Sequence, residues 1–364
     1  MKLSRSQQSA VHDIETICAS ETDSRTLRRR VAARLSREMH WDAACFATID
    51  PWTMLITDEI SEGVPDDSFA LVAHNEYLVD DVNKLVTLAR SSSRVGILSQ
   101  ALEQSQHTSP RLETVLAAFD VRHELRAAFV ADGQCWGALA LFRNGGRTDF
   151  GDEDAALVQT VTFAMAVGLR RTATQVDATV ELTDATDGPG VLVLNQNTEV
   201  LMANQAASAW LQEFPPHTIK GNGGLPLAVH QVVARVRMGS GASQLGAYAR
   251  IRTRAGHWLM VQGSLIGTPE QPDQGVSVVI SKAPSSDIAE LLMLAYGLTL
   301  RERQVLQRVI AGLSSAGIAA QMHISVNTVQ DHLKAVFAKV GVRSRGELVA
   351  QLLGRHYLPA VDSP

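Results

Sequence analysis

Short apolar runs, spaced as in β-strands, dominate the first part of this 364-residue chain. They lie at 43–49, 54–60, 126–131 and 136–142, and Asp132-Gly133 between the last two is a strong hairpin signal. Apolar residues spaced by three and four predict helices around these runs. The helical stripes are Leu27, Val31, Leu35 and Met39 before the strands, and Leu157, Val158, Val161, Met165 and Leu169 after them. This order predicts an antiparallel sheet with helices on its faces.

A second α+β unit follows from Gly190 onward. Its first two strands, 191–194 and 200–203, precede a helix that begins near Asn204. A Gly/Pro-rich break at 221–226 separates this helix from a second one through Val229–Val236. We expect three further strands to close the unit, at 248–253, 257–265 and 275–281.

The last part of the chain has only helical periodicity. Thr299 and Glu302 form a capping-box pair that opens a helix, and Gly312 suits its end. Ser314 can cap a second short helix, and a turn at 323–325 leads to a third from Val326 to about Lys339. Ser344 and Glu347 form another capping-box pair and open a fourth helix. Two short helices, a tight turn and a third helix with polar residues at its start are the geometry of a helix-turn-helix.

Motifs in the first two units point to sensory domains. The strand Trp136–Arg143, the turn Gly146–Phe150 and an exit helix with an acidic first turn resemble a GAF domain over residues 22–171. The second unit resembles a PAS domain, with Asn204–Ala207 where that family passes from strand to helix. The resemblance implies sensory or dimerising modules, many of which bind small ligands.

The C-terminal 60 residues resemble a LuxR-type DNA-binding domain. The matching residues are Leu298-Thr-x-Arg-Glu302, Gly312-Leu-Ser314, Ile318-Ala319, Ile324-Ser325, Thr328-Val329, His332, Lys339-Val-Gly-Val342, Ser344-Arg345 and Glu347-Leu-Val349. The chain departs from the family at Gly317, where an acidic residue is common, and at Gln330 and Asp331, which replace a lysine and an apolar residue. These departures put the target DNA sequence in question but not the docking mode.

The resemblance implies two sets of DNA contacts. For phosphates the residues are Ser314, Ser325, Thr328, Lys339 and Arg343, and for the groove they are Asn327, Gln330, Asp331 and Lys334. Gln330 could pair with adenine and Asp331 could accept from cytosine, or Asp331 could pair with Lys334. The hydroxyl groups could equally serve as helix caps. For Arg345 we favour an internal salt bridge with Glu347, and for His332 packing against the second helix.

Charge separates the C-terminal module from the rest. Residues 299–356 hold eight Lys and Arg against three Asp and Glu, whereas the whole chain has a net charge of −5. A basic module on an acidic body is typical of a protein whose other domains avoid nucleic acid. Chance clustering of cations on a solvated helix face would give the same count.

Composition excludes several classes of protein. With 45% apolar and 20% charged residues the chain suits a soluble globular protein, and no apolar run approaches the roughly 18 residues of a membrane span. Three cysteines without a CxxC motif exclude a disulfide framework and suit a reducing compartment. Cys45 and Cys135 could serve as redox sensors, although buried, inert cysteines are commoner. Phosphate-binding, metal-binding and nucleophile motifs are absent from the sequence.

We therefore expect an α+β multidomain protein: two antiparallel-sheet sensory domains followed by an all-α, four-helix helix-turn-helix domain. The expected boundaries are a helix at 1–21, a GAF-like domain at 22–171, a linker at 172–186, a PAS-like domain at 187–283 and the DNA-binding domain at 291–356, with its motif at about 314–334. The expected function is that of a cytoplasmic transcriptional regulator without enzymatic activity, metal or cofactor. The alternative is a signalling scaffold whose sensory domains bind a partner protein.

Double-stranded DNA, a second copy of the chain and a small sensory ligand are the expected partners. One recognition helix reads too few base pairs to single out a site in a genome, so such modules bind in pairs. The Leu27/Val31/Leu35 and Val158/Val161/Met165 stripes, or the fourth helix with Leu348, Leu352 and Leu353, could join the two copies. The same stripes could instead cover their own cores.

Overall fold

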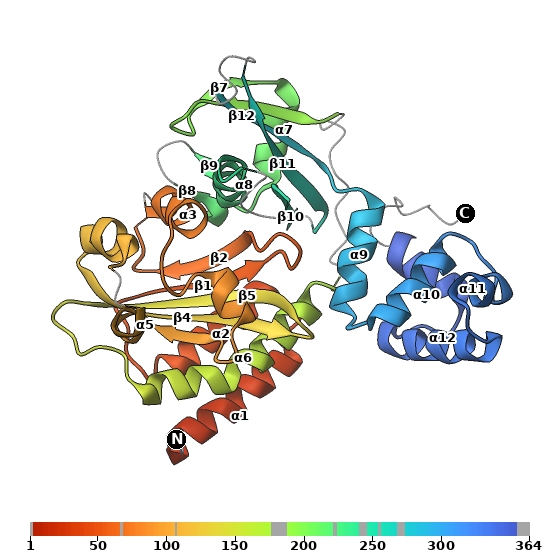
Figure 1. Cartoon of the computed structure of the whole chain (residues 1–364), viewed down its shortest axis with the longest axis horizontal. Coiled ribbons are helices and arrows are strands. Elements are labelled where there is room, and N and C mark those ends of the chain that lie inside the picture. Colours follow the sequence, from red (N-terminus) through yellow and green to blue (C-terminus); the bar gives the residue numbers. More distant parts are fainter. Residues whose placement is uncertain are drawn as a thin grey trace.

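Two antiparallel sheets with helices and a separate helical lobe make up the computed structural model (Figure 1). The structure describes residues 3–65, 68–105, 108–175, 188–220, 224–239, 246–253, 256–267 and 274–354. Most of the expected linker at 172–186 and part of the expected hairpin at 254–256 therefore lie outside the described residues.

The first sheet contains five antiparallel strands in the order β2-β1-β5-β4-β3. They are β1 (Ala43–Ile49), β2 (Ile56–Glu62), β3 (Val95–Ile97), β4 (Val121–Ala131) and β5 (Gln134–Asn144). Asp132 and Gly133 both have positive φ, 50° and 75°, which gives the tight turn expected between β4 and β5. Strand β3 was not predicted because three residues show no alternation.

Helices cover both faces of this sheet. Alternate residues of β4 separate the two sides: Phe129 packs with α1, α2 and α6, whereas Ala128 packs with Leu88 of α4. The helices are α1 (Arg5–Ser20), α2 (Ser24–Leu35), α3 (Ser68–Leu78), α4 (Leu85–Arg90), α5 (Leu98–Ser105) and α6 (Asp152–Thr172), with the short helical turns η1 (Arg111–Leu116) and η2 (Ala117–Phe119).

The helical stripes that could have joined two copies belong to this core. Leu27, Val31 and Leu35, like Val158, Val161 and Met165, are each at most 1% exposed and pack on the first sheet. Leu348 and Leu352 are also fully buried in their own module. The prediction that these stripes pair two copies was therefore wrong, because an amphipathic pattern shows that a face is buried but not by which partner.

The second sheet has the order β10-β11-β12-β6-β7. Its strands are β6 (Gly190–Leu194), β7 (Val200–Ala203), β10 (Tyr248–Arg252), β11 (Trp258–Ile266) and β12 (Gly275–Lys282), and a small pair is formed by β8 (Ile219–Lys220) and β9 (Leu225–Pro226). Asn204 caps α7 (Gln205–Glu213) by accepting from the amide of Ala207 at 2.8 Å. The short turn η4 (Pro216–Thr218) follows, and α8 (Leu227–Arg237) packs on the sheet through Val229 and Val232.

The two sheet units are joined by buried polar contacts. Asp50, after β1, receives a fork of two hydrogen bonds from Arg250 of β10, at 2.8 and 2.7 Å, and both side chains are at most 2% exposed. Tyr77 of α3 donates to Gln231 of α8 at 2.5 Å. Leu55 and Tyr77 complete the core of the second unit. The two units consequently form one continuous body in Figure 1.

Helix α9 (Ser285–Ala295) connects this body to the C-terminal lobe and was not predicted. Leu291, Leu294 and Ala295 pack into the first core, whereas Ile288 and Leu292 pack into the core of the lobe. The helix ends at Gly297, whose φ of 66° lies in the left-handed region. Every side chain from Leu291 to Ala295 is buried, so this half of α9 is shared between both cores, whereas Ser286 and Glu290 near its start are exposed.

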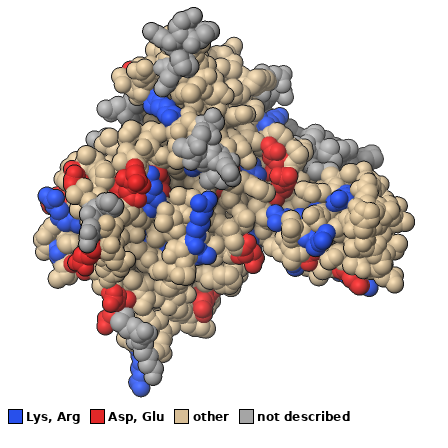
Figure 2. Space-filling view, in the orientation of Figure 1, with Lys and Arg blue, Asp and Glu red and all other residues tan. Residues whose placement is uncertain are grey.

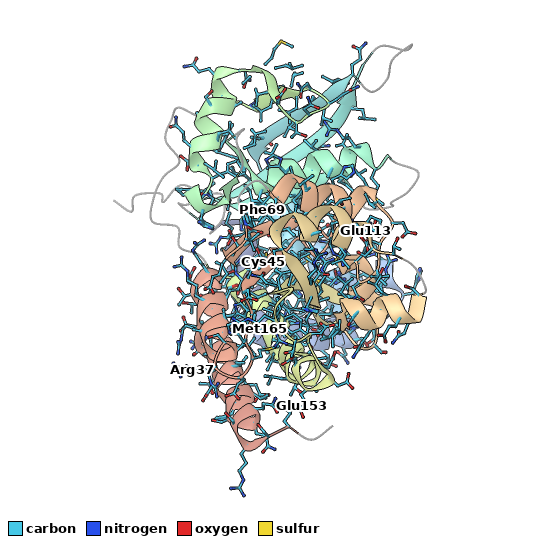
Figure 3. The ribbon with its side chains drawn as sticks, turned by 90° about the vertical axis from the view of Figure 1, so that its left-hand side faces the viewer. Arg37, Cys45, Phe69, Glu113, Glu153 and Met165 are labelled. Atoms are coloured by element: carbon cyan, nitrogen blue, oxygen red, sulfur yellow. The ribbon has the colours of Figure 1, made fainter. Side chains whose placement is uncertain are left out.

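The three cysteines lie in the first unit, where Cys18 and Cys135 are buried and Cys45 is partly buried; Figure 3 labels Cys45 and Met165 in this unit and Arg37 near its outer side. Burial raises the pKa of Cys18 and of Cys135 to about 12, and it raises the pKa of Cys45 well above its usual value. The reactive thiolate is therefore rare at neutral pH, which favours inert core residues over redox sensors. None of the helices in the described part of the chain is long and apolar enough to cross a membrane.

Candidate nucleic-acid interface

Four helices and a last helical turn form the C-terminal lobe. They are α10 (Leu300–Ile310), α11 (Ser315–Met322), α12 (Val326–Val340), α13 (Arg345–Val349) and η5 (Ala350–Gly354). Val305, Ile318, Val329 and Val336 face one another in a core in which each is completely buried. The four-helix arrangement expected from the sequence is confirmed.

Hydroxyl caps begin each of these helices. The Thr299–Glu302 capping box is complete, with the Thr299 amide donating to the Glu302 carboxylate at 2.7 Å. Ser314 accepts from the amide of Gly317 at 3.2 Å, and Ser325 accepts from that of Thr328 at 3.0 Å. The caps fix where each helix starts and therefore which side chains stand at its N-terminal end.

The cap of α13 differs from the prediction by one residue. The Ser344 hydroxyl accepts from the Glu347 amide at 3.1 Å as expected. The Glu347 carboxylate, however, accepts from the amide of Arg343 at 2.7 Å rather than from that of Ser344. The hydroxyl half of the predicted box is confirmed and the carboxylate half is wrong.

The turn between α11 and α12 is compact and rigidly bonded. His323 ends α11 in the left-handed region with φ 54°, a conformation that histidine adopts more readily than most residues. The amide of Ile324 then reaches back to the carbonyl of Ala319 at 3.0 Å. Ser325 follows at once as the cap of α12. The turn thus presents the first two turns of α12 at the surface of the lobe.

These first turns of α12 expose all of the residues predicted to enter a DNA groove. Asn327, Gln330, Asp331 and Lys334 are exposed, and the side chains of Asp331 and Lys334 have 75% and 77% of their surface accessible. Asp331 pairs with Lys334 at 3.5 Å, which confirms the second of the two partners expected for Asp331. An exposed pair at this distance contributes under about 1 kcal/mol, so either partner can exchange it for a base edge.

Ser315 of α11 belongs to the same surface and was missed by sequence reasoning. Gln330 of α12 donates to the Ser315 hydroxyl at 3.0 Å. This bond holds the Gln330 amide nitrogen toward α11, and the amide oxygen accepts no bond from the residues that the structure describes. The signal in the sequence was a second serine directly after the Ser314 cap, which helix capping alone does not explain.

The residues predicted to contact phosphates have different surroundings. The hydroxyls of Ser325 and Thr328 are bonded to each other at 2.9 Å on the exposed end of α12, and Arg343 is exposed after the same helix. Lys339 is instead held internally, because its ammonium donates to Glu302 at 2.7 Å and to the carbonyl of Gly297 at 3.1 Å. Although burial opposes it, this ion pair holds the pKa of the Glu302 carboxyl below its usual value.

Other cations of the lobe stabilise its fold. Arg345 donates to the carbonyls of Val309 and Leu313, so it is internal as favoured, but it bonds to backbone oxygens and not to Glu347. Arg308 donates to Gln321 at 3.2 Å across α10 and α11. His332 is half-buried on α12, and its packing against the second helix stays a prediction.

Charge on the lobe suits a polyanion. On the face that Figure 2 shows, Lys and Arg outnumber Asp and Glu over the right-hand lobe. The exposed Lys334 on α12, the exposed Arg343 after it, the hydroxyl groups at the start of the helix and its exposed polar face together match the way a recognition helix enters a major groove between two phosphate backbones.

Comparison with known proteins places the lobe in a family. Residues 297–352 match the model for bacterial regulatory proteins of the luxR family. Over 113 residues the chain is 27% identical to a probable HTH-type transcriptional regulator, GfsR, of Streptomyces halstedii, covering 31% of this chain and 42% of that protein. Over 65 residues it is 42% identical to the monoamine regulon transcriptional regulator of Klebsiella aerogenes, covering 18% and 27%. The chain thus spans less than half the length of these relatives.

One solved structure aligns with less than half of the chain. The GAF domain/HD domain protein of Geobacter sulfurreducens aligns with 42% of this chain and 94% of its own, with 17% identity and a TM-score of 0.32. A likeness at this score carries no argument about the function of the two sheet units. Their layout, two antiparallel sheets covered by helices, is established by the structure itself.

Proposed function

We propose that this chain, whose residues 297–352 form a helix-turn-helix domain of the luxR family, is a sequence-specific DNA-binding transcriptional regulator. The observation that supports this most strongly is the exposed first part of α12. It begins at the Ser325 cap directly after the turn from α11, and it carries the exposed side chains of Asn327, Gln330, Asp331 and Lys334. The two sheet units act as input domains, and the chain works in the cytoplasm without catalysing a reaction.

The proposal assigns distinct roles to the two residue sets. Asn327, Gln330, Asp331 and Lys334 read base edges in the major groove. Ser314, Ser325, Thr328 and Arg343 contact phosphates, and Lys339 joins them once its bond to Glu302 opens. The predicted domain boundaries, 22–171, 187–283 and 291–356, remain part of this proposal, with α9 as an additional element that joins the second domain to the third.

Band-shift titration against pooled genomic fragments tests the assignment. Lys334→Ala should weaken binding to the selected site by about 1–3 kcal/mol while leaving the circular dichroism unchanged. Lys282→Ala is the matched control, since Lys282 is also exposed but lies at the end of β12, outside the lobe. Equal binding by both variants and the unmodified chain would contradict the groove assignment.

We further propose that the active form is a homodimer. A single α12 reads only a few base pairs, and pairing doubles the length of DNA that is read. The surface that fits a second copy is the edge strand β7, where Val200, Leu201 and Met202 are 44%, 59% and 64% exposed. Beyond β7 no further strand pairs with this sheet among the described residues. An uncharged apolar edge pairs readily with its own copy about a two-fold axis.

Light scattering on the full chain tests the dimer. A dimer at about 10 µM that dissociates in Leu201→Lys but not in Phe163→Ser supports pairing through β7. Phe163 is a suitable control because it is 62% exposed on α6, far from this edge in the fold. A monomer at this concentration, or a dimer that Leu201→Lys leaves intact, would refute the proposed pairing.

The scaffold alternative makes a different prediction. If the sheet units serve chiefly to bind a partner protein, the lobe should retain DNA only weakly and without preference for sequence. Retention of particular genomic fragments at about 150 mM salt distinguishes the regulator from the scaffold, because non-specific binding is mainly electrostatic and falls steeply with salt.

A further inference from the structure

Ser315, Val326 and Gln330 lie at the starts of α11 and α12, on the surface proposed to meet DNA. Ser315 is the first residue of α11, and Val326 is the first residue of α12. Gln330 follows Val326 by one helical turn, and side chains at this spacing are neighbours on the surface of a helix. The hydroxyl caps Ser314 and Ser325 stand directly before the two helices and fix where they start. The backbone positions of all three residues are therefore fixed within the lobe.

The side-chain amide of Gln330 has two chemically different ends. Its nitrogen can only donate hydrogen bonds, and its oxygen can only accept them. The nitrogen donates to the Ser315 hydroxyl at 3.0 Å, so this bond sets which end of the amide faces α11. Gln330 is exposed, and its oxygen accepts no bond from any residue in the described part of the chain. The oxygen is thus available to a donor outside the protein.

Val326 places an apolar side chain near this acceptor. It is 45% exposed and does not belong to the core of the lobe. Single exposed apolar side chains are common on protein surfaces. This one, however, lies at the place from which the first residues of a recognition helix contact base edges. The apolar group that the major groove offers to such a side chain is the 5-methyl group of thymine.

We propose that Gln330 and Val326 together read one A·T base pair and that Ser315 is the positioning residue that sets this preference. In the major groove, adenine offers an amino donor to the Gln330 oxygen, and thymine offers its methyl group to Val326. Guanine presents only acceptors there, which oppose the Gln330 oxygen. Cytosine has an amino donor, but a C·G pair has no methyl group for the valine. The inference rests on the proposed function and states which base pair the recognition surface selects.

Ser315 acts on the base preference without touching the DNA. When its hydroxyl is removed, the Gln330 amide is able to turn over and present its nitrogen to the groove. The nitrogen donates to guanine O6 or N7, so adenine and guanine are no longer distinguished. Loss of the hydroxyl should therefore change the preference at one base pair, whereas a residue that only supports the fold would weaken binding to all sequences alike.

Fluorescence anisotropy with the full chain measures this preference on the selected genomic fragment and on duplexes with each single base pair replaced. The unmodified chain should prefer A·T to G·C about tenfold at one position. Gln330→Ala and Ser315→Ala should both lose this preference, and the double variant should lose no more than Gln330→Ala alone. Ser315→Thr keeps the hydroxyl and should retain the preference. Gln321→Ala is the matched control and should change no position, because Gln321 is exposed on α11 but bonds to Arg308.

Uracil in place of thymine tests the contact of Val326 and requires no change in the protein. The substitution removes only the 5-methyl group. At the selected A·T pair it should weaken binding by the unmodified chain about fourfold, which corresponds to one buried methyl group. Val326→Ala should bind the uracil and thymine duplexes equally, because the side chain that covers the methyl group has been removed.

Four results would overturn the inference. These are a preference for G·C at the position that Ser315→Ala changes, no position that Ser315→Ala changes, equal binding of uracil and thymine duplexes by the unmodified chain, and an undiminished effect of uracil in Val326→Ala. Each leaves the proposed function intact, because the unmodified chain still prefers one sequence. Absence of any sequence preference in the unmodified chain would refute the proposed function and this inference together.

Discussion

Replacing Asp50 with asparagine should destabilise the folded chain by about 3–5 kcal/mol, because it leaves the buried Arg250 guanidinium without its counter-charge. The two side chains are 1% and 2% exposed. Arg250 donates to both carboxylate oxygens and also, at 3.0 Å, to the carbonyl of Asp287 in α9. One charge pair therefore ties the first sheet, the second sheet and α9 together.

The magnitude follows from burial rather than from the number of bonds. Asparagine can keep one of the two acceptor bonds, each worth about 1.5–3 kcal/mol when charged, but not the negative charge that compensates Arg250. Asp13→Asn provides the control, since Asp13 pairs with Arg34 at 2.7 Å but is 47% exposed. An exposed pair of this kind contributes about 0–1 kcal/mol.

Urea unfolding followed by far-ultraviolet circular dichroism measures both variants against the unmodified chain. The reasoning predicts a clear loss of stability for Asp50→Asn and almost none for Asp13→Asn. If Asp50→Asn loses less than about 1 kcal/mol, or no more than the control, then the buried pair does not hold the two sheet units together and the account of their junction is wrong.

Three other predictions test separate parts of the structure. Burial would raise the pKa of the Asp58 carboxyl, but Arg28 and His217 outweigh it and hold that pKa well below its usual range. The stabilisation from Asp58 should therefore be complete above pH ~4, and the free energy of unfolding should fall by about 1.4 kcal/mol per pH unit below it. Acid titration of Asp58→Asn should show a shallower fall, and an unchanged slope would exclude this role. Gly297→Ala should cost about 1–3 kcal/mol in thermal unfolding, because φ is 66° and the new methyl group would meet the Arg170 guanidinium at 3.2 Å; a neutral effect would show that the end of α9 is not fixed. Lys339→Ala should lower the affinity for all DNA and reduce the dependence of log affinity on log salt concentration by about one unit. Glu302→Gln should instead free the Lys339 ammonium and strengthen DNA binding. Identical behaviour of the two variants would place Lys339 outside the DNA contacts.

Local signals predicted the C-terminal lobe well. The caps Thr299, Ser314 and Ser325 act within three residues of themselves, so their hydrogen bonds could be inferred from spacing alone. The exposed face of α12 follows from the same periodicity that buries Val329 and Val336. Only the partners of long side chains escaped prediction, such as the bond from Lys339 to Glu302, because they join positions 37 residues apart.

Contacts between distant segments were not predictable. The second half of helix α9, Leu291–Ala295, is apolar without interruption because both cores share it, so it shows no amphipathic pattern in the sequence. Asp50 and Arg250 are 200 residues apart, and nothing in either local sequence points to the other. Tertiary packing alone brings such residues together.

Fluorescence anisotropy with the full chain and labelled genomic fragments, measured from 50 to 300 mM salt, tests whether this protein reads DNA sequence. At about 150 mM salt we expect one class of fragment to bind at least about a thousandfold more tightly than unrelated DNA of equal length, and Lys334→Ala to remove most of that preference. Equal affinity for all fragments at every salt concentration, in the unmodified chain and in Lys334→Ala alike, would contradict a sequence-specific regulator.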